Sequence, residues 1–228
     1  MLMAMKLEHP VNDKNSLENE YVILLHGLAR SAHSMDKMAE RLTAQGYKVL
    51  NIDYPSRSYS IEQLAEKTIS DALLQCEGMP VSFVTHSMGG ILVRQFLSNH
   101  TVKNLNKVVM LGPPNKGTEI VDKLSNIPGF HLVNGDAGMQ LGTGALSVPN
   151  QLGKANFDVG IIAGTQSINL ILSSLIPDTD DGKVSVESTK VEGMNDHIEM
   201  PTTHVFMMRN DAVIEQVLHY LKQGKFEH

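Results

Sequence analysis

Thr85-His86-Ser87-Met88-Gly89-Gly90 carries most of the structural information in this chain. It follows the apolar run 81–84 and precedes residues 91–97, which have the character of a helix. A serine between a buried strand and a helix, with glycine two residues later, is typical of a tight turn that exposes the serine Oγ above a sheet. Glycine at 89 lets helix and strand approach closely, since a Cβ would clash. The helix start also directs N–H groups and a positive dipole end at the space above Ser87.

One position departs from the usual G-x-S-x-G pattern of such turns. Thr85 stands where the first glycine is expected, and a β-branched residue is larger than that position usually allows. The alternative reading is a glycine-rich helix start in which Ser87 is only a cap. The double glycine that follows and the strand-turn-helix context favour an exposed nucleophile.

Bulk composition limits the class of protein. The chain has 228 residues, of which 42% are hydrophobic and 19% charged, as expected for one domain with a sizeable core over 1–228. A net charge of -6 without a basic block excludes nucleic acid as an expected partner. The single cysteine, Cys76, rules out an internal disulfide and a cysteine-based zinc site. We expect no metal, no cofactor, and a monomer, with a small oligomer as the alternative.

The N-terminal sequence bears on where in or outside the cell the protein is expected. Residues 1–7 lack the long apolar core and cleavage site of a signal peptide, and no apolar stretch is long enough to span a membrane. We therefore expect a cytoplasmic protein. A secreted form whose presequence has been removed is the alternative.

Apolar runs and turn residues alternate along the chain in a strand-helix order. This order predicts an α/β fold with a mostly parallel central sheet of about six strands and helices on both faces. The carboxyl ends of parallel strands share one rim, where sites form. The predicted strands are 21–25, 47–52, 81–84, 107–111, 159–163 and 197–200, and the longer predicted helices are 34–45, 61–76, 91–97 and 210–224.

Two segments do not fit this alternation. Residues 1–20 read as an irregular, polar lead-in. Residues 115–156 hold many glycines, so we expect a loop-rich excursion over the rim with one short helix near 119–124. A plain surface crossover is the alternative.

Acyl transfer by a serine needs a base to take its proton and a carboxylate to hold that base in the right tautomer. After such a turn the chain order is serine, acid, histidine. Asp181 is the preferred acid, because it directly precedes Gly182, whose turn would orient it; Asp180 is the alternative. A calcium loop beginning at Asp178 is disfavoured, because Gly182 stands where an oxygen ligand is needed.

His204 is the expected base, from its place between the last strand and the last helix. Its rival, His197, would lie at the start of a strand, away from the rim. His86 is expected to pack beside the site, and His26 to fix its own loop by hydrogen bonding.

An oxyanion hole needs two N–H donors aimed at the developing charge. The backbone N–H of Met88, directly after the nucleophile, is one candidate, and that of Leu28, in the loop after the first strand, is the other. We expect Arg30, in the same loop, to be a surface residue. The alternative is that it binds an acidic group of the substrate.

From Tyr21 to Phe226 the chain resembles a bacterial α/β-hydrolase of the lipase/esterase type. The resemblance implies this fold, a Ser87-Asp181-His204 triad, an oxyanion hole from Leu28 and Met88, and a small ester or lipid-like substrate. The segment after Pro113 is similar to the P-x-x-G-[ST] segment of compact lipases. The residues that carry the resemblance are 26–28, 85–90, 112–118, 180–184 and 203–204.

These features lead to three functional hypotheses. The first is a serine-dependent carboxylic-ester hydrolase that works through an acyl-enzyme. The second is a thioesterase or acyltransferase with the same triad. The third is a non-catalytic binding protein on a hydrolase fold, which predicts a broken triad.

Overall fold

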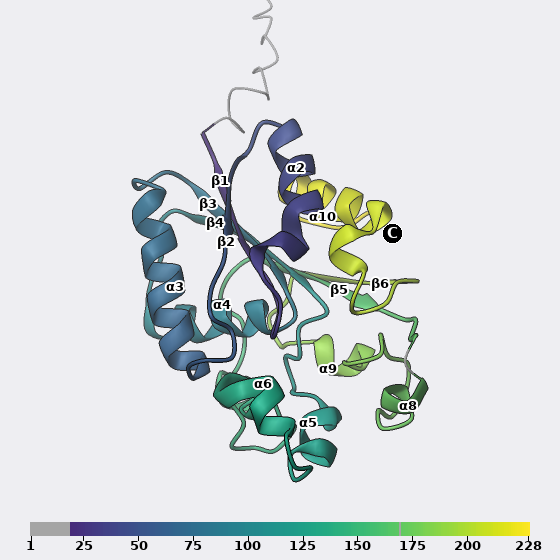
Figure 1. Ribbon diagram of the computed structural model, residues 1–228. Coiled ribbons are helices and arrows are strands. Elements are labelled where there is room, and N and C mark those ends of the chain that lie inside the picture. The colour runs from purple at the N-terminus through teal and green to yellow at the C-terminus, as the bar shows by residue number, and fades with distance from the viewer. Residues whose placement is uncertain (1–18, 169) are drawn as a thin grey trace, which may run out of the picture.

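The computed structural model describes residues 19–168 and 170–228, so the lead-in expected over 1–20 lies almost entirely outside the described residues. A six-stranded sheet forms the centre of the molecule, and every neighbouring pair of strands is parallel (Figure 1). The predicted parallel sheet is thus confirmed. In spatial order the strands are β2 (Lys48–Ile52), β1 (Tyr21–Leu25), β3 (Val81–His86), β4 (Leu105–Leu111), β5 (Val159–Gly164) and β6 (Asp196–Met200).

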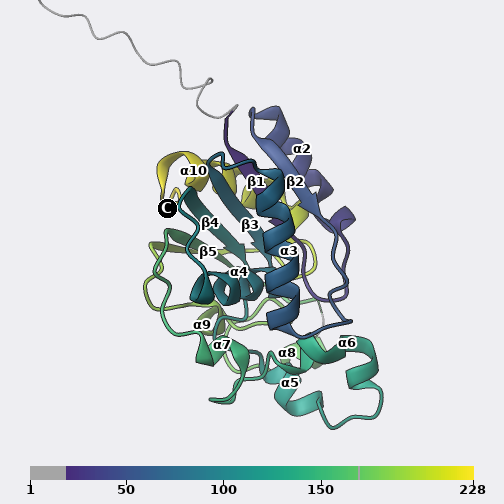
Figure 2. The same ribbon diagram turned by 90° about the vertical axis from the view of Figure 1, so that its left-hand side faces the viewer.

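Helices cover both faces of the sheet. On one face lie α3 (Ile61–Gln75) and α4 (Met88–Asn99), and on the other lie α2 (Asp36–Ala44) and α10 (Asp211–Gln223) (Figures 1 and 2). Successive strand side chains point to opposite faces, so Phe83 joins the core under α3 and α4, while Val84 joins the core under α2 and α10. Burial on both faces explains why the inner strands β1 and β5 are apolar throughout, whereas the edge strands β2 and β6 carry polar residues and are more exposed.

The ends of the two long predicted helices follow from local chemistry. Ser60 Oγ accepts from the N–H of Gln63 at 3.4 Å and Gln63 Oε1 accepts from the N–H of Ser60 at 3.3 Å, which makes a capping box at the start of α3. Asn210 caps α10, and Gly224 ends it with a φ of 71°.

Residues 115–156, which we call the cap segment, lie across the carboxyl ends of the strands (Figures 1 and 2). The short helix predicted near 119–124 is present as α5 (Glu119–Leu124), but the segment also holds two helices that were not predicted, α6 (Phe130–Met139) and α7 (Val148–Gln151). The many glycines suggested loops, but some of them lie within or beside helices, where they allow close packing. Gly135 adopts a φ of 66° inside α6, where an added Cβ would lie 1.9 Å from the carbonyl oxygen of Arg57.

The remaining elements are short: η1 (Ala32–Met35), α8 (Leu170–Ser173), α9 (Val186–Thr189) and η2 (Met207–Arg209). Within 19–168 and 170–228, no helix combines the length and apolar character that crossing a membrane requires.

Candidate active site

Ser87 stands at the sharp turn between β3 and α4. Its backbone has a φ of 54° and a ψ of -122°, a conformation that non-glycine residues adopt only when their surroundings enforce it. Two contacts provide that enforcement. The N–H of Ser87 donates to the carbonyl oxygen of Leu111 at 2.8 Å, and α4 lies so close to β1 that a Cβ on Gly89 would come within 2.6 Å of the Leu25 carbonyl oxygen.

The structure also explains the threonine that replaces the first glycine of the motif. Thr85 is fully buried in β3. A Cβ on Gly90 would lie only 3.2 Å from Thr85 Oγ1, so the second glycine of the pair leaves room for the larger residue below it. Among the described residues, the hydroxyl of Thr85 has no hydrogen-bond partner, so its role here is steric.

Three residues from distant parts of the chain meet at this turn. His204 Nε2 lies 3.0 Å from Ser87 Oγ, and His204 Nδ1 lies 2.7 Å from Asp181 Oδ2. Asp181 and His204 are buried, and Ser87 is half-buried. The order hydroxyl, imidazole, carboxylate is the one that activates a serine nucleophile.

Asp181 is held in place by its own turn. Its Oδ1 accepts hydrogen bonds from the N–H groups of Lys183 at 3.0 Å and Val184 at 2.9 Å. Its carbonyl oxygen accepts from the N–H of His204 at 2.9 Å, so acid and base are also joined through the backbone. These bonds fix the orientation of the carboxylate and leave Oδ2 free for the imidazole.

The alternative residues lie outside this relay. The Asp180 carboxylate accepts from the N–H of Gly182 at 2.6 Å and from Ser173 Oγ at 2.5 Å, so it shapes the turn instead. His197 lies at the start of β6 and pairs with Thr189 Oγ1 at 3.0 Å. The structure therefore brings Ser87, Asp181 and His204 together and leaves Asp180 and His197 elsewhere.

The two candidate oxyanion donors flank the serine. Met88 is the first residue of α4, and N–H groups in the first turn of a helix have no acceptor within it. Leu28 follows β1 and lines the same cavity as Ser87.

Two further histidines support the site without joining the relay. His26 is buried, its Nδ1 is 2.8 Å from the Gly27 carbonyl oxygen, and its ring stacks on Tyr54 with centroids 4.1 Å apart. His86 Nε2 lies 2.9 Å from the carbonyl oxygen of His204; because a carbonyl only accepts, this nitrogen carries the proton. Burial, followed by the neighbouring His204, holds the pKa of His86 well below its usual value, so this ring stays neutral.

A cavity of about 200 Å³ opens beside Ser87 and His204. Its apolar wall comes mainly from the cap segment. Among the described residues that line it, Arg30 and Lys183 carry charge and none is an aspartate or glutamate. The apolar residues of the cap segment that face it are Ile120, Val121, Leu124, Phe130 and Leu141.

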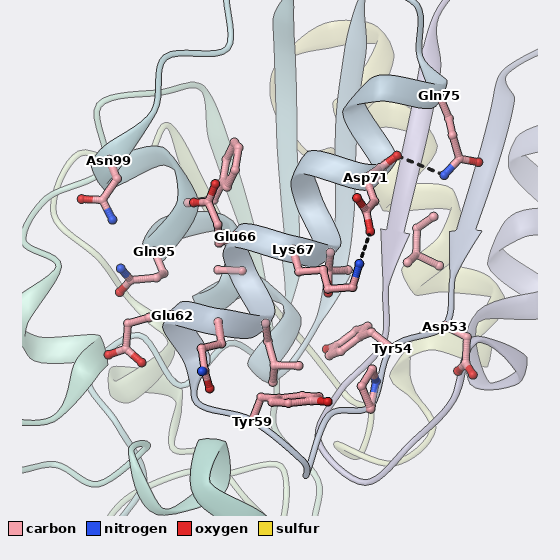
Figure 3. Close-up of a pocket in the computed structure, with 18 of the residues that line it drawn as sticks. Asp53, Tyr54, Tyr59, Glu62, Glu66, Lys67, Asp71, Gln75, Gln95 and Asn99 are labelled. Atoms are coloured by element: carbon pink, nitrogen blue, oxygen red, sulfur yellow. Dashed lines mark hydrogen bonds and ion pairs between the residues drawn. The ribbon is translucent and has the colours of Figure 1, made fainter.

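A larger cavity, of about 1050 Å³, lies away from this site. It flanks α3, with Tyr54 and Tyr59 on one side and Gln95 and Asn99 of α4 on the other (Figure 3). Among the described residues, no serine, cysteine or histidine lines it, so it lacks the serine-histidine pair that the smaller cavity holds. The smaller cavity is therefore the candidate for serine-based chemistry.

A parallel sheet covered on both faces, with a strained serine turn after its third strand, defines an α/β-hydrolase. Comparison with known families agrees. The chain belongs to the hydrolase family described as "Serine aminopeptidase, S33", whose model matches residues 18–133, just over half of the chain. The matched residues include Ser87 and end before Asp181 and His204.

Solved structures with the same fold include several lipases and esterases. Lipase BlEst2 of Bacillus licheniformis, in its mature form, has a TM-score of 0.72 at 20% identity, over 95% of this chain and 96% of that one. The metagenomic carboxyl esterase MGS0156 has a TM-score of 0.69 at 15% identity, over 90% of this chain and 76% of that one. A monoacylglycerol lipase of Paleococcus ferrophilus has a TM-score of 0.57 at 17% identity, over 90% and 94%. No curated protein matches in sequence.

Proposed function

We propose that this protein is a serine-dependent carboxylic-ester hydrolase with Ser87 as nucleophile, His204 as base and Asp181 as the acid that orients it. The observation that supports this most strongly is the unbroken relay from Ser87 Oγ to His204 Nε2, 3.0 Å apart, and from His204 Nδ1 to Asp181 Oδ2, 2.7 Å apart. A non-catalytic protein on this fold would not need all three groups within hydrogen-bonding distance of one another.

In the proposed mechanism, Ser87 Oγ attacks the ester carbonyl while His204 Nε2 takes its proton. The N–H groups of Leu28 and Met88 stabilise the oxyanion of the tetrahedral intermediate. His204 then protonates the leaving alcohol, which leaves an acyl group on Ser87. Water, deprotonated by the same imidazole, attacks this acyl-enzyme and releases the acid.

The dimensions of the cavity favour small acyl groups. About 200 Å³ with an apolar wall accommodates a short hydrocarbon chain and not a long one. We therefore propose short-chain esters as the preferred substrates, with chain length set by the side chains that α5 and α6 contribute.

The description of the family raises a second candidate, hydrolysis of peptides at a free N-terminus. An aminopeptidase recognises the substrate's ammonium group, which calls for an acidic side chain near the nucleophile. The cavity offers Arg30 and Lys183 and no carboxylate in its lining, so it would repel that group. Ester hydrolysis is therefore favoured over aminopeptidase activity.

The test is hydrolysis of p-nitrophenyl esters from acetate to palmitate by the wild type and Ser87→Ala. We expect a rate that peaks at short chains and falls by ~10⁴–10⁶ in the variant, because the relay acts as a unit. Labelling by a fluorophosphonate probe, with Ser87→Ala as control, reports the nucleophile independently of the substrate. Folded protein that neither labels nor cleaves any ester would overturn the proposal. Labelling without ester cleavage would favour the thioesterase or acyltransferase alternative, which acyl thioesters and alcohol acceptors would test.

A further inference from the structure

Arg30 and Lys183 line the Ser87 cavity, and neither has an anionic partner among the residues that the structure describes. We propose that they form an anion-binding subsite, so that the preferred ester carries a carboxylate or phosphate group near the scissile bond. This inference rests on the proposed function and narrows its substrate class.

The two cations reach the cavity from separate loops. Arg30 follows β1, two residues after Leu28, and Lys183 lies in the turn two residues after Asp181. Both are exposed to solvent, and both line the cavity that holds Ser87 and His204. An anion bound between them would therefore lie beside the reacting carbonyl.

Neither cation is neutralised by the protein. Over residues 19–168 and 170–228, the guanidinium of Arg30 and the ammonium of Lys183 form no ion pair within 4.0 Å, and neither donates a hydrogen bond. This chain has 25 acidic residues for 19 lysines and arginines. Several other cations in it are paired, including Lys37, Arg41, Lys67 and Lys190.

Asp181, two residues before Lys183, does not neutralise the ammonium of that lysine. Asp181 opposes the net lowering of the Lys183 pKa, so its charge is felt there. Both of its oxygens are nonetheless occupied, Oδ1 by two backbone N–H groups and Oδ2 by His204. Partial removal from water, and then the neighbouring Arg30, lower the pKa of Lys183. Two like charges held this close are unfavourable until an anion lies between them.

Arginine and lysine differ in a way that suits this arrangement. A guanidinium binds a carboxylate or phosphate through two parallel N–H···O bonds, and an ammonium adds a compact point charge. The anionic group has two sources, the acyl part of the ester or its alcohol part. The binding chemistry is the same for both, so the substrates in the test are chosen to separate them.

For the acyl part, the test compares p-nitrophenyl hemisuccinate with its neutral methyl ester. For the alcohol part, it compares 1-butyryl-glycerol 3-phosphate with 1-butyrylglycerol. The readout is the ratio of kcat/KM for the charged to the neutral member of each pair. We expect a ratio of about ten or more for one pair, which Arg30→Gln and Lys183→Gln each lower about tenfold and Lys183→Arg largely keeps. Added salt should lower it too, because both cations are exposed.

Lys103→Gln is the matched control, since it removes one exposed cation at the opposite end of the sheet, just before β4. It should leave both ratios at the wild-type value. Ratios near one for both pairs in an active enzyme, or ratios that Arg30→Gln and Lys183→Gln leave unchanged, would overturn the subsite while leaving ester hydrolysis intact.

A binding experiment keeps the two proposals separate. Calorimetric titration of Ser87→Ala with 1-butyryl-glycerol 3-phosphate and with hemisuccinate methyl ester measures the subsite without any turnover. At least one anion should bind, and should bind about tenfold more weakly after Lys183→Gln. If the wild type cleaves no ester yet this binding is present, ester hydrolysis fails and the subsite stands. Absence of binding, together with charge-independent turnover, refutes the subsite alone.

Discussion

Arg94 donates two hydrogen bonds from one nitrogen to Asn115, at 3.0 Å to the main-chain oxygen and at 3.1 Å to the side-chain oxygen. Its other terminal nitrogen donates to the carbonyl oxygen of Gly153 at 2.7 Å. Asn115 and Gly153 lie at the two ends of the cap segment, so one buried side chain on α4 fastens both ends to the hydrolase core. Burial lowers the pKa of Arg94 to about 10, so the guanidinium stays charged at neutral pH.

Replacing Arg94 by methionine should destabilise the protein, because two buried acceptors on Asn115 and the carbonyl oxygen of Gly153 lose their donor. Arg94 is 4% exposed, so water cannot take its place. We expect a loss of about 2–4 kcal/mol in the free energy of unfolding. Arg94→Lys, which keeps the charge but cannot span both ends, should lose less. Urea denaturation measures the free energy of unfolding of both variants and of the wild type. A methionine variant within about 0.5 kcal/mol of wild type would contradict the clamp.

Asp181→Asn should lower kcat by ~10⁴, because an amide at this position no longer stabilises the imidazolium and favours the wrong tautomer of His204. Asp180→Asn is the matched comparison, one residue away and also buried. Its carboxylate holds the turn through Gly182 and Ser173, so its loss should cost stability and far less rate. Steady-state kinetics with a p-nitrophenyl ester separates the two. Equal losses in both variants would argue against Asp181 as the orienting acid.

Acid should weaken the fold through His86. Its pKa in the folded state lies well below its usual 6.5, so the unfolded chain binds the proton more readily. Stability contributed by this ring is present above pH 6.5 and is lost as pH falls, by up to about 1.4 kcal/mol per pH unit. His26 and His197 shift in the same direction through burial.

The check is urea denaturation of wild type and His86→Gln at about pH 7.5 and about pH 5. Glutamine keeps an N–H donor for the His204 carbonyl and removes the titration. The wild type should lose more stability between the two pH values than the variant, by a margin approaching about 2 kcal/mol. Identical losses would mean that the His86 ring is protonated as easily in the folded state as in the unfolded chain.

Leu124 on α5 should help to set acyl chain length. Its side chain lines the Ser87 cavity, so Leu124→Ala should enlarge the space and move the optimum toward longer p-nitrophenyl esters, with about a tenfold change in relative kcat/KM. Leu132→Ala is the control, since this leucine of the same cap segment is 84% exposed and does not line the cavity. If the optimal chain length shifted in both variants, or in neither, the wall of the cavity would not be what sets acyl chain length.

Much of the fold was predictable because burial leaves a strong pattern. Strands covered on both faces read as uninterrupted apolar runs, and Ser60, Asn210 and Gly224 mark helix ends by chemistry that is local in sequence. The turn at Ser87 was predictable because close packing against the adjacent strands leaves little room for a Cβ at the two glycines that follow the serine.

The cap segment was predicted less well because its structure depends on distant contacts. Gly135 looks like a helix breaker in sequence, yet it is needed where α6 meets the carbonyl of Arg57. The choice of Asp181 over Asp180 rested on one neighbouring glycine, and only the hydrogen bonds of each carboxylate distinguish the two in the structure. The clamp made by Arg94 left no signal, because nothing in the sequence links positions 94, 115 and 153.

Ser87 and His204 are 117 positions apart, and strands β4, β5 and β6 come between them in the chain. Contacts of such long range form late, after the loops between them have closed. During synthesis Ser87 is made well before His204, so a nascent chain carries the proposed nucleophile without its proposed base. Under the proposed function, the relay is completed only once the last strand and last helix have been made, and a shorter nascent chain would be inert toward esters.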